Sequence, residues 1–278
     1  MKTIKWTLLF LCCLGLTRLA AQPTFQVRKE GAGKRAIVFI PGFACSGDVW
    51  EETVKEYKND YTCYILTMPG FAGVKPDVDP DLKKWVAQIA GFIKEHQLEK
   101  PIIVGHSLGG GMALLLASRY PDLVGRIVVV DVLPCLSAVM NPGFRSDPNP
   151  DCSMLVGRFT KLDDGAFVQM QQQSMRGLLA DTTKTAEVIH WGVTSNRQTL
   201  GRIFCQFSNM DLRDSLGTIT CPAMILLEAP FVRMKPAVEA QYQGLHTATL
   251  SYATKGLHFI MFDDRQWYMD HLAQFIKQ

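Results

Sequence analysis

Long hydrophobic segments are scarce in this chain of 278 residues. The longest apolar run, Trp6 to Leu16, is about half of the ~20 residues that a membrane-spanning helix needs, and no other segment approaches that length. Stable membrane insertion is therefore not expected. Lys2 and Lys5 precede the run, and the segment Leu19-Ala20-Ala21, with its two small residues, offers a cleavage site. We interpret residues 1–21 as a signal peptide and expect the mature protein to be soluble and either secreted or periplasmic.

An excess of positive charge is also missing. The whole chain has 29 basic and 26 acidic residues, and the predicted signal peptide carries three of the basic ones (Lys2, Lys5 and Arg18) and no acid, which leaves a formally neutral mature chain. Proteins that bind nucleic acids normally show a surplus or a stripe of Lys and Arg, and this sequence shows neither. Nucleic acid is therefore not an expected partner.

Closely spaced cysteine pairs are absent as well. None of the cysteines that follow the signal peptide forms a C-x-x-C pair, so the sequence favours neither a zinc site nor a redox motif, and no metal or cofactor is expected. An oxidising compartment allows disulfides to persist, but the spacing does not choose a pairing, and several thiols could equally be buried and free. These cysteines are Cys45, Cys63, Cys135, Cys152, Cys205 and Cys221.

Short apolar runs alternate with amphipathic stretches from residue 36 to about residue 131. This alternation is typical of βαβ units, and it predicts the α/β class: a mostly parallel sheet with helices on both faces. Apolar residues recur at helical spacing from Leu82 to Ile93, and a second helix is expected from Leu108 to Tyr120. The expected strands are Ala36–Ile40, Tyr61–Thr67, Ile102–Val104, Ile127–Val130, Ala223–Leu227 and Thr247–Tyr252.

The alternation stops between residues 133 and 220. A loop rich in proline and aspartate, 141–151, leads into stretches with helical periodicity and no clear strand. We therefore predict a helical cap at 133–220 that is inserted into a core formed by residues 22–132 and 221–278.

The pentapeptide Gly105-His106-Ser107-Leu108-Gly109 matches G-x-S-x-G and lies between a predicted strand and a predicted helix. A sharp strand-to-helix turn leaves no room for side chains at the two flanking positions, which are glycine here. The turn also places Ser107 at a helix N-terminus, where free amides favour developing negative charge. Ser107 is therefore our candidate nucleophile.

The segment IVGHSLGG at 103–110 resembles the nucleophile elbow of the α/β-hydrolase fold family. The resemblance implies an oxyanion hole made by the backbone N–H groups of Leu108 and of a residue in an earlier loop, here Phe43. Many relatives have histidine where this chain has Pro41, which leaves the identity of the second donor open. The family's chain order of serine, acid and histidine makes His258 the candidate base, since it follows the last predicted strand.

The acid of the triad is the clearest departure from the family pattern. Its usual position falls near Phe231, and the loop 229–232 contains no carboxylate. Asp131 ends the strand after the nucleophile helix, a position from which certain haloalkane dehalogenases of the family supply the acid, and Glu228 ends the later strand. We favour Asp131 over Glu228, because a carboxylate at the end of an apolar strand is costly unless it is paired.

These residues predict an exported serine hydrolase that cleaves carboxylic esters of small molecules through an acyl-enzyme. Trp50 and Phe71 follow strand ends at the same edge and are candidates for shaping the acyl pocket. A lipase, thioesterase, amidase or C–C hydrolase on the same triad stays open, as does a ligand-binding protein with little turnover. Dehalogenase and epoxide hydrolase chemistry is disfavoured, because those relatives have aspartate where Ser107 stands.

Overall fold

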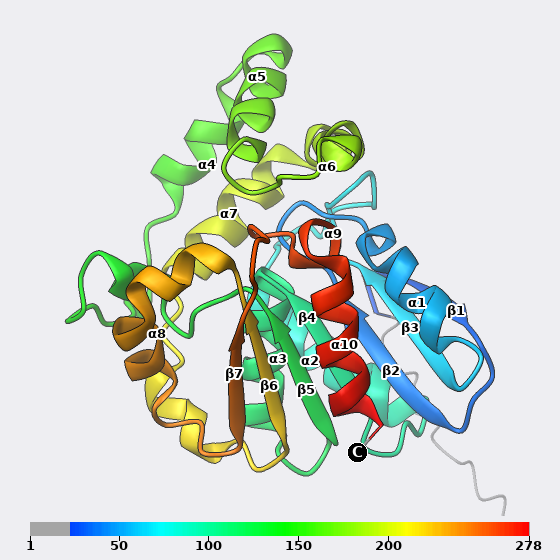
Figure 1. The fold of residues 1–278 in the computed structure, drawn as a ribbon. Helices are drawn as coiled ribbons and strands as arrows, with labels where there is room; N and C mark the ends of the chain where they lie inside the picture. The colour runs from blue at the N-terminus through cyan, green and yellow to red at the C-terminus, as the bar shows by residue number, and fades with distance from the viewer. Residues whose placement is uncertain (1–22, 278) are drawn as a thin grey trace, which may run out of the picture.

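The computed structural model describes residues 23–277, which form one seven-stranded sheet with helices on both faces (Figure 1). The strand order is β1-β3-β2-β4-β5-β6-β7; β1 runs antiparallel to β3, and all other neighbours are parallel. The α/β class and the mostly parallel sheet predicted from the sequence are confirmed. The strands are β1 (Gln26–Glu30), β2 (Arg35–Ile40), β3 (Tyr61–Thr67), β4 (Ile102–His106), β5 (Arg126–Val130), β6 (Ala223–Leu227) and β7 (Ala248–Tyr252).

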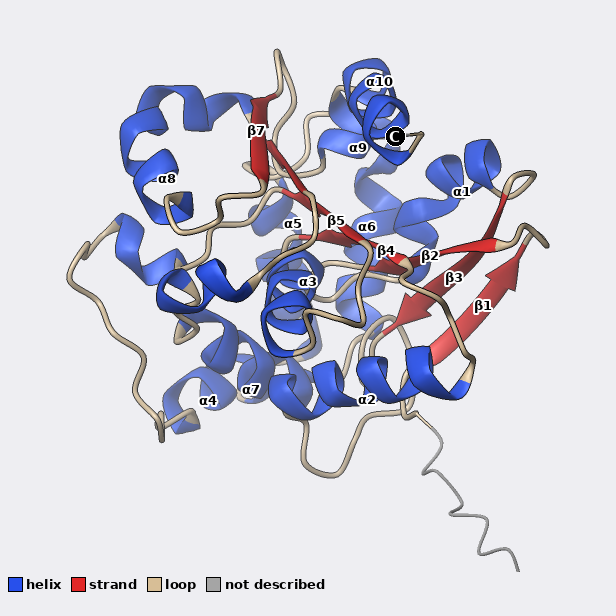
Figure 2. Cartoon of the chain, turned by 90° about the horizontal axis from the view of Figure 1, so that it is seen from below, coloured by secondary structure: helices blue, strands red, loops and turns tan. Residues whose placement is uncertain are grey.

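Helices cover the two faces of the sheet unequally, as the view from below shows (Figure 2). One face carries α1 (Glu51–Tyr57) and α10 (Arg265–Ile276), with the single turn α9 (Ile260–Asp263) before α10. The other face carries α2 (Leu82–Glu95), α3 (Leu108–Arg119) and α8 (Lys235–Tyr242). The central strands β2 and β4 are therefore covered on both sides, which explains why each is apolar along most of its length instead of alternating.

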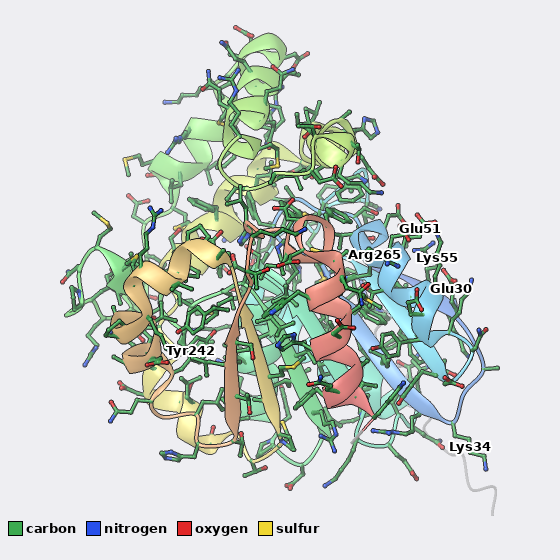
Figure 3. All side chains as sticks on the ribbon, viewed as in Figure 1. Glu30, Lys34, Glu51, Lys55, Tyr242 and Arg265 are labelled. Carbon is green, nitrogen blue, oxygen red and sulfur yellow. A yellow bond between two sulfur atoms is a disulfide. The ribbon has the colours of Figure 1, made fainter. Side chains whose placement is uncertain are left out.

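The surface helices α1 and α10 are joined by charged side chains at the rim of the sheet (Figure 3). Lys55 pairs with Glu52 at 2.8 Å within α1, and Arg265 reaches Glu56 of the same helix at 3.3 Å. Exposed pairs of this kind contribute little stability individually, so burial of apolar side chains is the main force that holds the two helices on the sheet.

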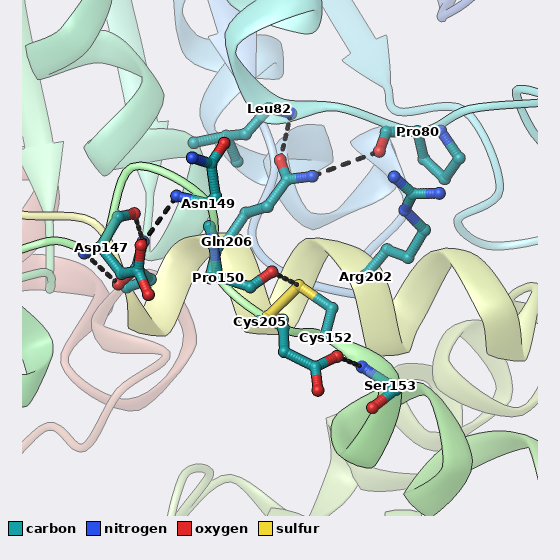
Figure 4. The surroundings of a disulfide bond; sticks show 12 residues. Pro80, Leu82, Asp147, Asn149, Pro150, Cys152, Ser153, Arg202, Cys205 and Gln206 are labelled. Atoms are coloured by element: carbon teal, nitrogen blue, oxygen red, sulfur yellow. Dashed lines mark hydrogen bonds between the residues drawn. A yellow bond between two sulfur atoms is a disulfide. The ribbon is translucent and has the colours of Figure 1, made fainter.

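The segment between β5 and β6 is mostly helical, and its α-helices lie above the sheet in Figure 1. It contains α4 (Ser153–Thr160), α5 (Asp164–Met175), α6 (Thr182–Thr194) and α7 (Arg197–Ser208), and we call these four helices the cap helices. A disulfide between Cys152 and Cys205 joins the start of α4 to α7 (Figure 4). Cys45, Cys63, Cys135 and Cys221 are buried free thiols, so the structure selects one pairing among the alternatives.

The predicted signal peptide, residues 1–21, lies outside the described residues. Within residues 23–277, no helix is both long and apolar enough to cross a lipid bilayer. The carboxyl ends of the parallel strands face the cap helices, and each candidate catalytic side chain follows one of these strand ends.

Candidate active site

Ser107 occupies the sharp turn between β4 and α3, and its backbone has φ 51° and ψ −120°. A non-glycine residue rarely adopts a positive φ, and such strain is typical of functional turns. The flanking glycines explain how the chain makes the turn: a Cβ at Gly105 would lie 2.2 Å from the carbonyl oxygen of Gly109. Ser107 donates its backbone N–H to the Val130 oxygen at 2.8 Å, which fixes the turn to the end of β5.

His258 and Asp131 form a short contact beside this turn. The Nδ1 atom of His258 lies 2.6 Å from Oδ2 of Asp131, whose side chain is almost completely buried (2% exposed). The other carboxylate oxygen, Oδ1, accepts the backbone N–H of Glu228 at 2.7 Å. A buried carboxylate needs such partners, and here both oxygens have one. The arrangement leaves His258 Nε2 as the ring nitrogen available to the nucleophile.

The structure brings Ser107, His258 and Asp131 to one cavity, where all three line the wall. No hydrogen bond joins the Ser107 hydroxyl to His258 within the described residues. In enzymes without bound substrate this contact is often long and tightens only when substrate binds.

Glu228 lies next to this pair and also lines the cavity, but the hydrogen bond to Asp131 comes from its backbone and not from its side chain. Burial, followed by the negative charge of Asp131, raises the pKa of the Glu228 carboxyl from 4.5 to about 7. His258 contacts the Asp131 carboxylate, so the geometry favours Asp131 over Glu228 as the partner of the base.

Of the two expected oxyanion donors, Phe43 lines the same cavity, and Leu108 directly follows Ser107, which is part of its wall. Leu108 is the first residue of α3, so its amide has no acceptor within the helix. The Phe43 amide forms no backbone hydrogen bond among residues 23–277. The Phe43 ring contacts Phe204 and Phe159 of the cap helices, with ring centroids 5.5 Å and 6.3 Å away, so cap side chains hold the loop that carries this amide.

The cavity has a volume of about 450 Å³ and lies between the strand ends and the cap helices. Most of its wall is apolar, with phenylalanine, leucine and methionine side chains from both parts of the chain. The polar exceptions besides the candidate catalytic residues are His106, Glu228, Gln171, Ser174 and Arg158. Such a cavity fits an apolar small molecule with a few polar groups.

The structure corrects the expectation for Trp50 and Phe71. Neither residue lines the cavity, and both side chains are completely buried. Phe71 packs against Phe43 at 5.5 Å between ring centroids, whereas Trp50 packs against His106 at 6.5 Å in the core on the α1 and α10 face of the sheet. Both residues follow strand ends as predicted, but their side chains turn into the core, where burial of a large aromatic ring is most favourable.

Sequence reasoning missed the cap residues that complete the wall. Gln171 of α5 is buried, and a Cβ at Gly192 of α6 would lie 2.6 Å from its Oε1 atom, so the amide fits a space that the glycine leaves. The helical periodicity of the cap sequence signals a buried face but does not say which core residues that face covers. Within residues 23–277, no cluster of three or more His, Cys, Asp or Glu side chains is arranged to hold a metal ion.

Comparisons with known proteins agree with this geometry. A family model described as alpha/beta hydrolase fold matches residues 35–194. The chain is 28% identical over 206 residues to a pimeloyl-[acyl-carrier protein] methyl ester esterase of Edwardsiella ictaluri, covering 69% of this chain and 73% of that protein. It is 22% identical over 253 residues to an N-formylmaleamate deformylase of Pseudomonas putida, covering 89% and 91%.

Solved structures share the fold at lower sequence identity. An enol-lactonase from Burkholderia xenovorans superposes with a TM-score of 0.74 at 13% identity, over 91% of this chain and 96% of that one. An esterase from Exiguobacterium antarcticum superposes with a TM-score of 0.75 at 17% identity, over the same shares.

Proposed function

Because the chain belongs to the alpha/beta hydrolase fold family and is a hydrolase, we propose that it is a serine esterase that cleaves small-molecule carboxylic esters through an acyl-enzyme. The observation that carries the proposal is the 2.6 Å contact between His258 and the buried Asp131, beside a serine held at positive φ. A serine hydroxyl is a weak nucleophile at neutral pH, and an oriented imidazole is the group that activates it.

In the proposed mechanism, the Ser107 hydroxyl attacks the ester carbonyl while His258 Nε2 accepts its proton. Asp131 accepts the Nδ1–H of His258, which fixes the tautomer and stabilises the imidazolium that forms. The Leu108 and Phe43 amides donate to the oxyanion, an interaction that is usually the largest single contribution to catalysis. His258 then protonates the departing alcohol, and a water molecule activated by the same ring hydrolyses the acyl-enzyme.

The cavity supports a substrate with an apolar acyl group. Its wall is mainly hydrocarbon and aromatic, and a volume of about 450 Å³ accommodates a small or medium-sized molecule. The esterases among the relatives and among the similar solved structures support ester cleavage over other acyl transfers.

Amide cleavage is the second candidate. It is favoured by the similarity over most of the chain to a deformylase, whose name implies cleavage of a formyl group from nitrogen. An amide needs stronger protonation of its leaving group than an ester does, so a comparison of matched ester and amide substrates distinguishes the two activities.

Export to an oxidising compartment is part of the proposal. It rests on the predicted signal peptide and on the Cys152–Cys205 disulfide, a bond that persists mainly outside the cytosol. N-terminal sequencing of the protein recovered from its native cells tests this point. A mature chain that begins near residue 22 is expected, and an intact N-terminus in a cytosolic fraction would contradict it.

The decisive experiment measures hydrolysis of p-nitrophenyl esters from acetate to octanoate by the mature protein and by Ser107→Ala. Turnover is expected to fall by about a million-fold in the variant. The control is Ser118→Ala, since Ser118 lies on the same helix outside the cavity and its hydroxyl donates only to the Leu115 oxygen. If the wild type is no faster than Ser107→Ala on any ester or matched amide, the proposal is wrong and a ligand-binding role takes its place.

A further inference from the structure

His106, the residue before the candidate nucleophile, is buried to 1% exposure although it is polar. It is the last residue of β4, and its ring packs among Trp50 and Phe259, which belong to the core on the face of the sheet that carries α1 and α10. Its ring centroid lies 4.7 Å from that of His258, 4.8 Å from that of Phe259 and 6.5 Å from that of Trp50. The mechanism proposed above assigns it no task.

One nitrogen of this ring has a defined partner. The Nε2 atom of His106 lies 2.9 Å from the backbone carbonyl oxygen of His258. A carbonyl oxygen only accepts hydrogen bonds, so Nε2 must carry the proton. Burial, followed by the nearby His258 ring, holds the pKa of His106 well below its usual value, so the ring is neutral at physiological pH. A neutral ring protonated at Nε2 has an unprotonated Nδ1.

The second nitrogen faces the loop that carries the oxyanion donor. His106 Nδ1 has no hydrogen-bond partner within residues 23–277. A Cβ added at Gly42 would lie 2.7 Å from this nitrogen and 3.3 Å from the Ser107 Cβ, so the glycine is what allows the loop to approach the ring. The ring therefore contacts the oxyanion loop on one side and holds the His258 backbone on the other.

His258 lies in an irregular segment between β7 and α9, where no helix or strand ladder fixes its backbone. The neighbouring residues are fixed: the Phe259 N–H binds the Leu178 oxygen and the Leu257 N–H binds Asp263. At His258 itself, the contacts are the side-chain bond to Asp131 and the carbonyl bond to His106. Two anchors, one on the ring and one on the backbone, define where Nε2 of His258 points.

We propose that His106 is a positioning residue for the base: its neutral ring donates from Nε2 to the His258 carbonyl and aligns the His258 imidazole between Asp131 and Ser107. The role rests on the proposed function only in treating His258 as the base. Because the ring stays uncharged, it anchors His258 without adding a positive charge that would oppose formation of the imidazolium. A displacement of about 1 Å at a reacting group lowers turnover by on the order of 100-fold, so such an anchor matters for catalysis.

A pair of substitutions separates the hydrogen bond from the packing. His106→Gln keeps an amide N–H close to the place of Nε2, whereas His106→Leu has a similar volume and no donor. We expect kcat of His106→Leu to fall by about 10- to 100-fold with KM within about threefold, and kcat of His106→Gln to stay within about fivefold of wild type. Equal losses in the two variants, or an unchanged kcat in folded His106→Leu, would overturn the proposal.

A second measurement needs no substrate and so remains decisive even if the protein cleaves no ester. In ¹⁵N-histidine-labelled protein at pH 7, the His106 ring is expected to be neutral with its proton on Nε2. The downfield proton between His258 Nδ1 and Asp131 is expected in the wild type and in His106→Gln, and is expected to shift or broaden in His106→Leu. An imidazolium or an Nδ1-protonated ring at His106, or an identical downfield signal in all three proteins, overturns the inference. Failure of ester cleavage alone overturns only the proposed function.

Discussion

Replacing Glu228 with glutamine is expected to change how the stability of the protein depends on pH. In the folded protein the pKa of this carboxyl is raised from 4.5 to about 7, first because the group is partly buried and second because Asp131 lies beside it. The folded state therefore holds a proton that the unfolded chain releases. Between pH 4.5 and about 7, the free energy of unfolding falls as pH rises, because ionisation is harder in the folded state than in the unfolded one.

The size of this effect follows from the shift. A difference between 4.5 and about 7 corresponds to roughly 3 kcal/mol at most, all of it lost above pH 7 and none of it below pH 4.5. Glu228 keeps contact with the cavity, where water screens its charge, so we expect about 1–3 kcal/mol. Glutamine has a similar shape and cannot ionise, so Glu228→Gln should lack this loss.

Urea unfolding followed by tryptophan fluorescence at pH 5 and pH 8 measures the effect. Groups far from Glu228 titrate equally in both proteins, so the quantity of interest is the difference in free energy of unfolding between Glu228→Gln and wild type. This difference should favour the variant by about 1–3 kcal/mol more at pH 8 than at pH 5. Glu99→Gln, an exposed glutamate after α2, serves as the control. If the difference between Glu228→Gln and wild type is the same at both pH values, the reasoning is wrong.

Three further predictions concern the acid, the disulfide and the cavity wall. Asp131→Asn should lower kcat in the ester assay by about 10⁴-fold, because the amide stabilises the wrong tautomer of His258. In the same assay, kcat of Glu228→Gln should stay within about tenfold of wild type. A loss of kcat that is larger in Glu228→Gln than in Asp131→Asn would make Glu228 the acid instead. Cys152→Ser should lower the free energy of unfolding by about 2–4 kcal/mol, since the bond to Cys205 closes a loop with a sequence separation of 53. Addition of a reductant should lower the urea midpoint of the wild type to that of Cys152→Ser. Gln171→Met should raise kcat/KM for octanoate over acetate esters by about 10-fold, because it removes a buried amide from an apolar wall; an unchanged chain-length preference would show that Gln171 does not contact the acyl group.

Features that depend on local sequence could be predicted well. The strand Tyr61–Thr67 and the helix after Ser107 have the expected bounds within one residue, because continuous apolar runs and helical spacing report burial directly. The turn at Ser107 has the strained backbone that its flanking glycines suggest. The edge strand β1 was missed, since its sequence QVRKE is largely polar and exposed and has no apolar run to mark it.

The orientation of side chains and the packing of one helix against another could not be predicted in this way. Trp50 and Phe71 follow strand ends, but whether a side chain there faces the cavity or the core depends on the backbone of the loop and on the helices packed against it. The partner of Cys152 depends in the same way on how α4 crosses α7, which no spacing along the chain reveals. Gln171 reaches the cavity because Gly192 of a different helix makes room for it.

The ends of two neighbouring strands, β5 and β6, both help to place the acid of the triad. The usual site of the family's acid, near Phe231, lies in a 3-10 helix, Ala229–Met234, that contains no carboxylate. Asp131 instead has φ 55°, a left-handed conformation that aspartate tolerates better than most residues, and its amide donates to the Leu226 oxygen at 2.8 Å. The neighbouring strand end still takes part, because Glu228 donates its backbone N–H to the Asp131 carboxylate. With the acid at the end of β5 instead of β6, the residue that follows β6 has a different role: its backbone N–H holds the Asp131 carboxylate in place beside His258.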